Sequence, residues 1–404
     1  QEILYIFVNH KMKNNMLGQR IKQFRLAKNY SLDELVAATG GIVSKVALSK
    51  YEREIIKPSN KVLTAIAKAL NVKTINLAVQ PIVKVEFVAY RKGSGLSKKE
   101  QSNVEYLVRA KLEDRVKIQD LLFASSKPNL PVKNFKVKSI EDVESFSVDL
   151  RSKWKLGLDP IGNLTELLEN NFVHVMFIDN EKSFDGISAL AYANDTQLKA
   201  AAVVSKNHIP GERQRLNLAH ELGHIVLDIA HNLDEEKVAF RFGGAFLAPK
   251  ESVLKAVGSR REHFQPRELF ILKKIFGISI QALLFRLKDL DIISQTSFLN
   301  WYRIINKNNW KKNEPMPMKE ETSHWFEKNV LHAFSEGLIS SDEAAHLLGE
   351  DIDSQELSLI KKKEFLKLSQ SDRGKILSEQ AEKFIQHYST DNDWKEFGGD
   401  IVEY

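Results

Sequence analysis

Apolar positions in the first eighty residues repeat at helical spacing and are interrupted by turns. Residues 17–29 predict one amphipathic helix, and the capping-box pattern SLDE at residues 31–34 predicts the start of a second. A Gly-Gly turn at residues 40–41 then precedes a polar-faced helix that begins near Ser44, and VLTAIAKALNV predicts a fourth helix. Two short helices joined by a glycine turn are typical of a helix–turn–helix domain, whose second helix lies in the DNA major groove.

The rest of the chain alternates between structured blocks and polar connections. A β-like run at residues 82–88 precedes a long charged helix with Leu107, Leu112 and Leu121 on its apolar side. The stretch 125–139, rich in Pro, Lys and Ser, and the stretch 306–320 predict linkers. Three further β-like segments lie between the linkers: Val173–Asp179, Ile187–Tyr192 and Leu198–Ser205.

The expected fold class is mainly α with an α+β centre, in which a small sheet belongs to the central domain. We expect an all-α head and a helical C-terminal region on either side of that domain. The expected parts are residues 1–16 (tail), 17–80 (head), 81–139 (connecting strand, long helix and linker), 140–295 (central domain), 296–320 (linker) and 321–404 (helical C-terminal region with an acidic-aromatic tail).

Composition limits the chemistry that the chain can carry. It has no cysteine, which excludes disulfides and thiolate ligands and fits a cytoplasmic protein. Any metal ion must therefore be held by His, Asp or Glu. No apolar run approaches the ~18 residues that a membrane helix needs, so we expect no membrane partner.

The net charge of +6 is unevenly distributed. Residues 1–80 hold thirteen Lys or Arg against five Asp or Glu, an excess of +8 in the first fifth of the chain. A local basic excess favours an interface with double-stranded DNA, and a solubilising face is the alternative.

The segment LNLAHELGHIVLD contains two histidines at helical spacing, His220 and His224, with Glu221 between them. Residues four apart lie on one face of a helix, so both rings can hold one tetrahedral metal ion. Glu221 is rotated beside the ion, where it can take a proton from the attacking water and return it to the leaving amine. This spacing predicts a zinc metallo-endopeptidase site of the HExxH type.

The surroundings of the motif support this interpretation. The helix is apolar on most sides, which predicts that the histidines are buried and need a partner such as a metal. Gly223 costs the helix roughly 1 kcal/mol, which indicates close approach by another element. An edge strand beside the helix can pair with an extended substrate.

The third ligand must come from downstream of the motif. The candidates are Asp228, His231, Glu235 and Glu236. A helix is predicted to begin near Asp234, but its phase does not separate Glu235 from Glu236, because both flank its apolar stripe.

The pattern R-x-R-x-x-x-AHELGH followed by E-x-x-A-x-x-F-x-x-x-F-L-x-P resembles the ImmA/IrrE family of bacterial and phage metallopeptidases over residues 140–295. The resemblance implies a gluzincin-like fold, a zinc cofactor and a third ligand at the start of the E-x-x-A run, which is Glu236. Arg213 and Arg215 match basic positions before the helix, and we expect them to order its start. His208 is a further candidate for a position behind the ligands.

The run SKVALSKYERE, with KPS and LTAIAKALNV after it, resembles the XRE/Cro-type repressor domain over residues 17–78. The resemblance implies base or phosphate contacts by Ser44, Lys45, Ser49 and Lys50, and phosphate contacts by Arg20 and Arg53. The family usually has glycine where this chain has Glu54, so we expect an altered turn there. A helical protein-binding module is the alternative.

The last sixteen residues, STDNDWKEFGGDIVEY, hold five acids and one lysine. The spaced side chains of Trp394, Phe397, Ile401 and Tyr404 predict docking on a basic partner. The stretch resembles the toxin-wrapping tails of bacterial antitoxins, which implies a PIN-type ribonuclease as partner. Folding back onto the chain's own core is the alternative.

These patterns together predict a DNA-binding transcriptional regulator of antitoxin type that forms a homodimer and cleaves or senses another regulatory protein. One alternative is a non-catalytic repressor or antitoxin in which zinc is only structural. The other is a stress-response peptidase that its head recruits to DNA.

Overall fold

The computed structural model describes residues 17–350, with gaps at 73, 79–81, 91–96, 127, 180–185 and 194–195, together with Ser369 and Gly374. The chain divides into two compact units, Gln1–Asn329 and Val330–Tyr404. Both the predicted tail at residues 1–16 and the partner-binding residues Trp394, Phe397, Ile401 and Tyr404 lie outside the described residues.

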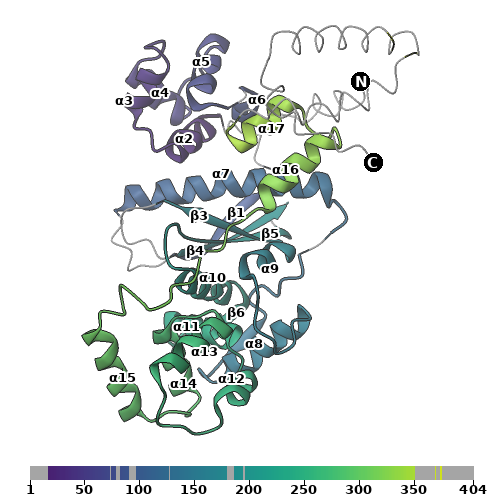
Figure 1. Ribbon diagram of the computed structural model, residues 1–404. Coiled ribbons are helices and arrows are strands. Elements are labelled where there is room, and N and C mark those ends of the chain that lie inside the picture. Colours follow the sequence, from purple (N-terminus) through teal and green to yellow (C-terminus); the bar gives the residue numbers. More distant parts are fainter. Residues whose placement is uncertain are drawn as a thin grey trace, which may run out of the picture. The chain divides into compact units, whose positions relative to one another are not determined.

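The head is a bundle of five short helices (Figure 1). They are α2 (Leu17–Ala27), α3 (Leu32–Ala38), α4 (Lys45–Glu52), α5 (Asn60–Leu70) and α6 (Thr74–Ala78). Ser31 and Glu34 form the predicted capping box of α3, and Ser44 caps α4. The apolar stripes of these helices meet in a core that includes Ile21, Leu35 and Leu48.

The turn after α4 keeps its geometry although Glu54 stands where the family usually has glycine. Glu54 adopts a left-handed backbone with φ +60°. Its N–H donates to Tyr51 O at 2.9 Å, and the N–H of Ile55 donates to Lys50 O at 2.9 Å, the bonding of a Schellman turn. The expected alteration is therefore absent, and the helix end carries a residue in a conformation that costs a non-glycine about 1–2 kcal/mol.

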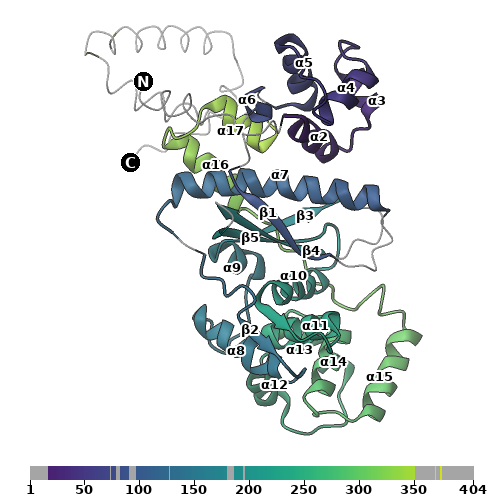
Figure 2. The same ribbon diagram turned by 180° about the vertical axis from the view of Figure 1, so that it is seen from behind.

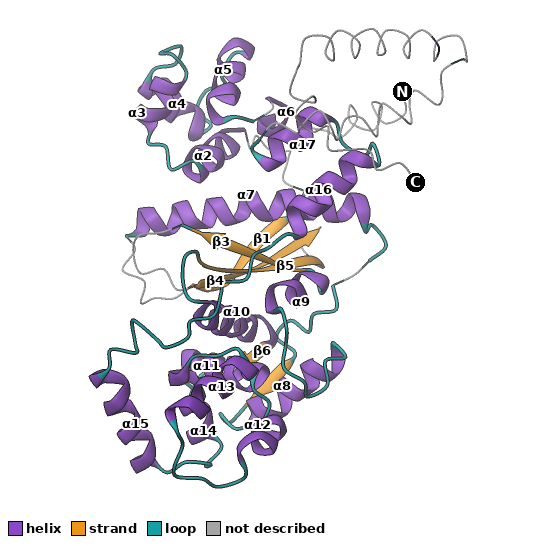
Figure 3. Ribbon diagram, in the orientation of Figure 1, coloured by secondary structure: helices purple, strands orange, loops and turns teal. Residues whose placement is uncertain are grey.

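A four-stranded sheet forms the middle layer of the central domain, in the order β1 (Lys84–Tyr90), β4 (Gly186–Ala193), β5 (Gln197–Lys206) and β3 (Val173–Ile178). β3 runs parallel to β5, whereas β4 is antiparallel to both of its neighbours. Figure 3 shows the strands between α7 (Lys98–Leu122) and α10 (Gly211–Val226). Alternate residues of β5 serve the two faces: Ala202 and Val204 pack toward α7, and Ala201 and Val203 pack toward α10.

Residues 81–139, predicted as a connection, contribute strands to this domain and the helix α7, which packs on one face of the sheet. β1 pairs with β4 from Lys84↔Tyr192 to Tyr90↔Ile187, and Val108 and Leu112 of α7 are fully buried against the sheet. Leu121, predicted on the apolar side of that helix, is 39% exposed. β2 (Phe135–Val137) lies within the predicted linker and pairs in parallel with β6 (Leu227–Ile229). These pairings could not be expected from local pattern, because each partner lies about 90 or more residues away.

Helices make up the rest of the central domain and are visible from behind in Figure 2. They are α8 (Asp142–Lys153), α9 (Leu164–Asn170), α11 (Glu235–Leu247), α12 (Lys250–Val257), α13 (Pro266–Phe276), α14 (Ile280–Asp289) and α15 (Gln295–Lys307). The predicted linker 296–320 differs from expectation, since most of α15 lies within it and buries Phe298, Trp301 and Ile305. An apolar stripe at helical spacing explains that helix.

The second unit contains the end of α16 (Trp325–Ser335) and α17 (Ser341–Leu348). Ser340 caps α17 by accepting from the N–H of Glu343. Among the residues that the structure describes, no helix combines the length and apolar character that crossing a membrane requires.

Candidate metal centre

Two helices, α10 and α11, pack closely enough to bring the predicted site together. A Cβ atom at Gly223 would lie 3.0 Å from Phe242 Cδ1 and 3.4 Å from Ala239 Cα. A Cβ atom at Gly243 would lie 3.2 Å from the backbone nitrogen of His220. The close approach predicted at Gly223 is confirmed, and α11 is the element that makes it.

The imidazole rings of His220 and His224 are buried and face the carboxylate of Glu236. Their Nε2 atoms are 3.0 Å apart. Glu236 Oε2 lies 3.4 Å from Nε2 of His220, and Oε1 lies 3.4 Å from Nε2 of His224. One donor atom from each residue lies within 4.8 Å of the others, so these three can surround one metal ion.

Glu235, the alternative that helical phase left open, contacts the other side of the ring. Its Oε1 lies 3.3 Å from Nδ1 of His224. A carboxylate at the far nitrogen of a ligating histidine orients the ring and fixes its tautomer. Asp228 and His231 do not join the three-residue group found among the described residues.

The electrostatics of the histidine pair suit a cation. Burial, and then the neighbouring His220 ring, lower the pKa of His224 to about 4. The ring is therefore neutral near pH 7 and offers a nitrogen lone pair. Two imidazoles and one carboxylate form a donor set that zinc prefers. The residues present thus fit a divalent metal ion.

Glu221 is positioned by β4, which the sequence did not connect with the motif. The hydroxyl of Ser188 donates to Glu221 Oε2 at 2.5 Å and to the Glu221 backbone oxygen at 3.0 Å. A Cβ atom at Gly186 would lie 2.2 Å from Glu221 Oε1, so only glycine leaves room for this carboxylate. Ser188 and Gly186 therefore fix the position of the Glu221 carboxylate against β4.

The strand that holds Glu221 is not an edge of the sheet, but the outer strand β1 also contacts α10, in agreement with the expected edge strand beside the site helix. β4 is hydrogen-bonded to β5 on one side and to β1 on the other. Within the described sheet, β1 and β3 are the outer strands. An extended peptide can add only to one of these two.

A buried polar network fixes the start of α10. The guanidinium of Arg215 donates to Gly277 O at 3.1 Å, to Ile161 O at 2.7 Å and to Glu321. Arg215 therefore orders the helix start as expected, whereas Arg213 is exposed. His208 is also exposed and lies 3.3 Å from Asp179, so it does not stand behind the ligands.

The residues predicted to contact DNA differ in accessibility. Ser44, Lys45, Lys50 and Arg53 are exposed on or beside α4, and Ser49 is partly buried there. Lys45 Nζ lies 2.6 Å from Asp33 Oδ2. Arg20 departs from the prediction, because it is only 5% exposed and lies 2.6 Å from Glu113 of α7. That ion pair withdraws Arg20 from a phosphate.

Comparisons with known proteins agree with the division of the chain into a head and a central domain. A family model described as helix-turn-helix matches residues 21–76, and one described as IrrE N-terminal-like domain matches residues 202–288. No curated protein matches the chain. The two matches cover the head and the segment that carries all four residues of the candidate site. The chain thus joins an XRE-type helix–turn–helix domain to an ImmA/IrrE-like metallopeptidase-like domain.

Proposed function

We propose that this protein is a DNA-binding transcriptional regulator whose central domain is a zinc-dependent endopeptidase acting on another regulatory protein. One observation carries the proposal: the two buried histidines and Glu236 converge within 4.8 Å of one another. Glu221 lies between the histidines in the chain and is held by Ser188.

His220, His224 and Glu236 are the proposed ligands of a zinc ion, and Glu235 orients His224 from its far nitrogen. When bound, zinc supplies Lewis-acid polarisation of the scissile carbonyl and of a water molecule. Three protein ligands leave a fourth position, as in catalytic rather than structural zinc sites.

Glu221 is the proposed general base and general acid. Its carboxylate removes a proton from the attacking water and delivers that proton to the departing amine nitrogen. Ser188 and Gly186 keep the carboxylate in place, so that its position does not have to be reached anew in each turnover.

The test separates metal binding from catalysis. Zinc content is measured by elemental analysis in wild type, His220→Ala and Glu221→Gln, with the exposed Glu251→Gln as a matched control. We expect near-stoichiometric zinc in all but His220→Ala. Wild-type protein without zinc, or with no more than His220→Ala, would refute the metal assignment.

Catalysis is then measured with the protein that Glu221→Gln captures from the native host. Wild type and Glu251→Gln should cleave it, and Glu221→Gln should not. Equal cleavage by Glu221→Gln removes Glu221 from the mechanism. Captured protein that no form cleaves supports the non-catalytic repressor instead.

The regulatory part of the proposal rests on the head. Exposed cations on and beside α4, Lys50 and Arg53, suit the phosphates of an operator. Binding to duplex DNA should weaken steeply with salt, because phosphate contacts release counterions. Salt-independent binding would contradict this role.

Toxin capture by the C-terminal tail and homodimer formation stay predictions. Deletion of residues 390–404 tests the first by loss of partner capture, and sedimentation of the full chain tests the second. If the protein still captured the same partner after the deletion, the antitoxin hypothesis would be wrong.

A further inference from the structure

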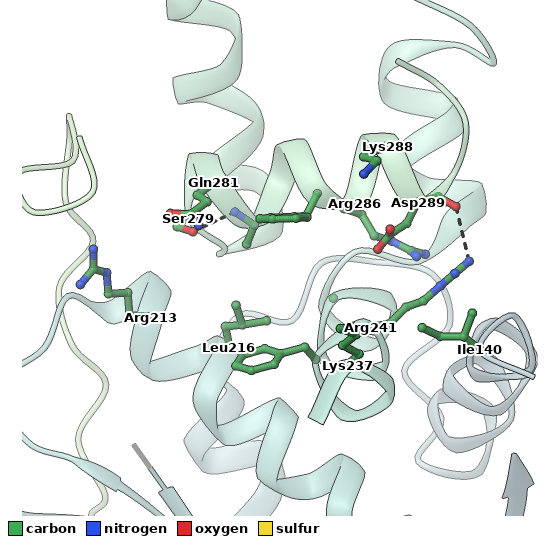
Figure 4. A pocket seen from close by; sticks show the side chains of 14 residues that line it. Ile140, Arg213, Leu216, Lys237, Arg241, Ser279, Gln281, Arg286, Lys288 and Asp289 are labelled. Atoms are coloured by element: carbon green, nitrogen blue, oxygen red, sulfur yellow. Dashed lines mark hydrogen bonds between the residues drawn. The ribbon is translucent and has the colours of Figure 1, made fainter. Parts of the chain in front are cut away.

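A cavity of about 690 Å³ opens between α14 and the α10–α11 pair (Figure 4). Its size lies in the range of 300–1,000 Å³ that encloses a ligand. Three of its lining residues flank the candidate metal centre: Leu216 lies one turn before His220, Lys237 follows Glu236, and the Phe240 ring centroid lies 4.1 Å from that of His220. The cavity therefore begins where the metal centre ends.

The cavity combines apolar surface with positive charge. Phe240 and Phe285 line it while remaining 38% and 42% exposed, an unusual exposure for large rings inside a hollow. Five Lys or Arg side chains line it, against one carboxyl, that of Asp289. Burial raises the pKa of Asp289, while the neighbouring Arg241 and Arg286 act in the opposite direction.

Three of the five cations are already paired with carboxylates, among them Lys237, whose Nζ lies 3.3 Å from Asp234 Oδ2, and two are not. Arg286 forms a two-pronged ion pair with Glu144, which also lies 3.6 Å from Arg241. Arg213 and Lys288, by contrast, form no ion pair with any residue in the described part of the chain; they line opposite ends of the cavity (Figure 4), and Lys288 Nζ lies 5.0 Å from the centroid of the Phe298 ring. A ligand carboxylate would supply the missing counter-charge.

We propose that this cavity is the specificity pocket of the peptidase and accepts a substrate segment in which an acidic residue adjoins an aromatic one. The inference rests on the proposed function, since it assigns the cavity to a polypeptide that crosses the metal centre. The rings of Phe240 and Phe285 contact the aromatic side chain. Arg213 binds the carboxylate through two N–H groups, and Lys288 adds positive charge at the opposite end of the cavity.

The test uses full-length, zinc-loaded Glu221→Gln protein, so that binding is measured without cleavage. Fluorescein-labelled peptides with the centre Ala-Phe-Glu-Glu-Ala, Ala-Phe-Gln-Gln-Ala or Ala-Phe-Lys-Lys-Ala are titrated by anisotropy. The acidic peptide should bind at least tenfold more tightly than the amide peptide, and the lysine peptide most weakly. The preference should shrink as salt is raised, because charge interactions are screened.

Variants of the pocket locate the effect. Adding Arg213→Glu and Lys288→Glu should weaken the acidic peptide about tenfold or more and erase the preference. Lys274→Glu, an equal charge change at an exposed position of α13 outside the pocket, should leave it intact. Phe285→Ala should weaken all three peptides by a similar factor.

Equal binding of the three peptides, no binding of any, or an equal loss in Lys274→Glu would overturn the pocket assignment. So would a single-stranded oligonucleotide of ten thymidines that competes as well as the acidic peptide, since that would make the cavity a nucleic-acid site. If wild type cleaves its target but the three peptides bind equally, the pocket assignment fails and the peptidase proposal stands. If the acidic peptide binds selectively but nothing is cleaved, the peptidase proposal fails and the pocket assignment stands.

Discussion

The head and the central domain place their function-bearing side chains in opposite environments. In the head, Lys50 and Arg53 stand in solvent on or beside one short helix. In the central domain, His220 and Glu221 are at most 2% exposed and are assembled with residues from α11 and β4. A DNA interface needs an accessible charged face, whereas a metal site needs ligands that their neighbours hold in fixed positions.

Because of this difference, substitutions in the two regions should have different effects on folding. A surface contact in the head can be lost with little effect on folding, because its side chain packs against nothing. A buried group in the central domain contacts neighbours from several elements, so its loss also disturbs residues in those elements. Four predictions test this contrast, beginning with the largest expected effect.

Gly186→Ala should lower peptidase turnover by about 100-fold or more while zinc stays bound. The new Cβ would lie 2.2 Å from Glu221 Oε1, so the carboxylate must move, and a displacement of about 1 Å costs on the order of 10² in rate. Turnover and zinc content are measured on the same sample. Gly162→Ala is the matched control, since a Cβ there meets nothing within 4 Å, and equal turnover in both variants would contradict the positioning role.

Gly18→Ala should destabilise the head by about 2–3 kcal/mol. A Cβ on this residue would lie 2.1 Å from Tyr51 O, and overpacking by a rigid backbone atom cannot be relieved by a rotamer change. Amide hydrogen exchange in α2–α5 measures the change within the head. The exposed Lys22→Ala in the same helix is the control, and protection equal to wild type in Gly18→Ala would show that the two helices are less close than described.

His174 should make the stability of the central domain fall with decreasing pH. Burial lowers the pKa of this ring well below 6.5, and its Nε2 lies 3.0 Å from Gln119 Oε1. The unfolded chain therefore binds the proton first, and the free energy of unfolding should drop by about 1.4 kcal/mol per pH unit below pH ~6.5. At higher pH the contribution of this group is constant.

His174→Gln should reduce the slope by about 1.4 kcal/mol per pH unit, whatever its effect on absolute stability, in urea unfolding followed by tryptophan fluorescence. The exposed His263→Gln should keep the slope of wild type. Parallel pH profiles for wild type and His174→Gln would show that the ring does not titrate as inferred.

Lys50→Ala should have the smallest effect, a few-fold loss of affinity for duplex DNA. Removing one phosphate contact should reduce the slope of log K against log salt by about 0.9 and leave folding unchanged. The exposed Lys68→Ala, near the end of α5, is the matched control. If both variants reduce the slope equally, the charge of the head acts as a whole and α4 has no special part.

Prediction from sequence succeeded where the determinants are local. The helices of the head follow from apolar periodicity and caps, and the meeting of the His220 and His224 rings follows from helical spacing. The choice between Glu235 and Glu236 did not follow from phase, because it depends on the angle at which α11 crosses α10. The structure brings Glu236 to the Nε2 atoms of both rings.

What escaped prediction is non-local. Ser188 lies 33 positions before Glu221, and no spacing rule links a strand serine to a helix glutamate. The sequence around Arg20 is typical of an exposed helix position. In the structure, however, Arg20 forms an ion pair with Glu113, which lies 93 positions away. The packing of α14 over α10 and α11, which creates the cavity, is likewise a tertiary property.

The pairing of β1 with β4 also sets an order of events during synthesis. Lys84 pairs with Tyr192, which is synthesised more than 100 residues later, so β1 cannot pair with β4 until then. At about 5–20 residues per second, that interval lasts on the order of ten seconds on the ribosome. The head, whose core comes entirely from residues before 80, is complete by then. The nascent chain therefore carries a folded DNA-binding module followed by an unpaired, apolar strand, and this is the stage at which chaperones have most to protect.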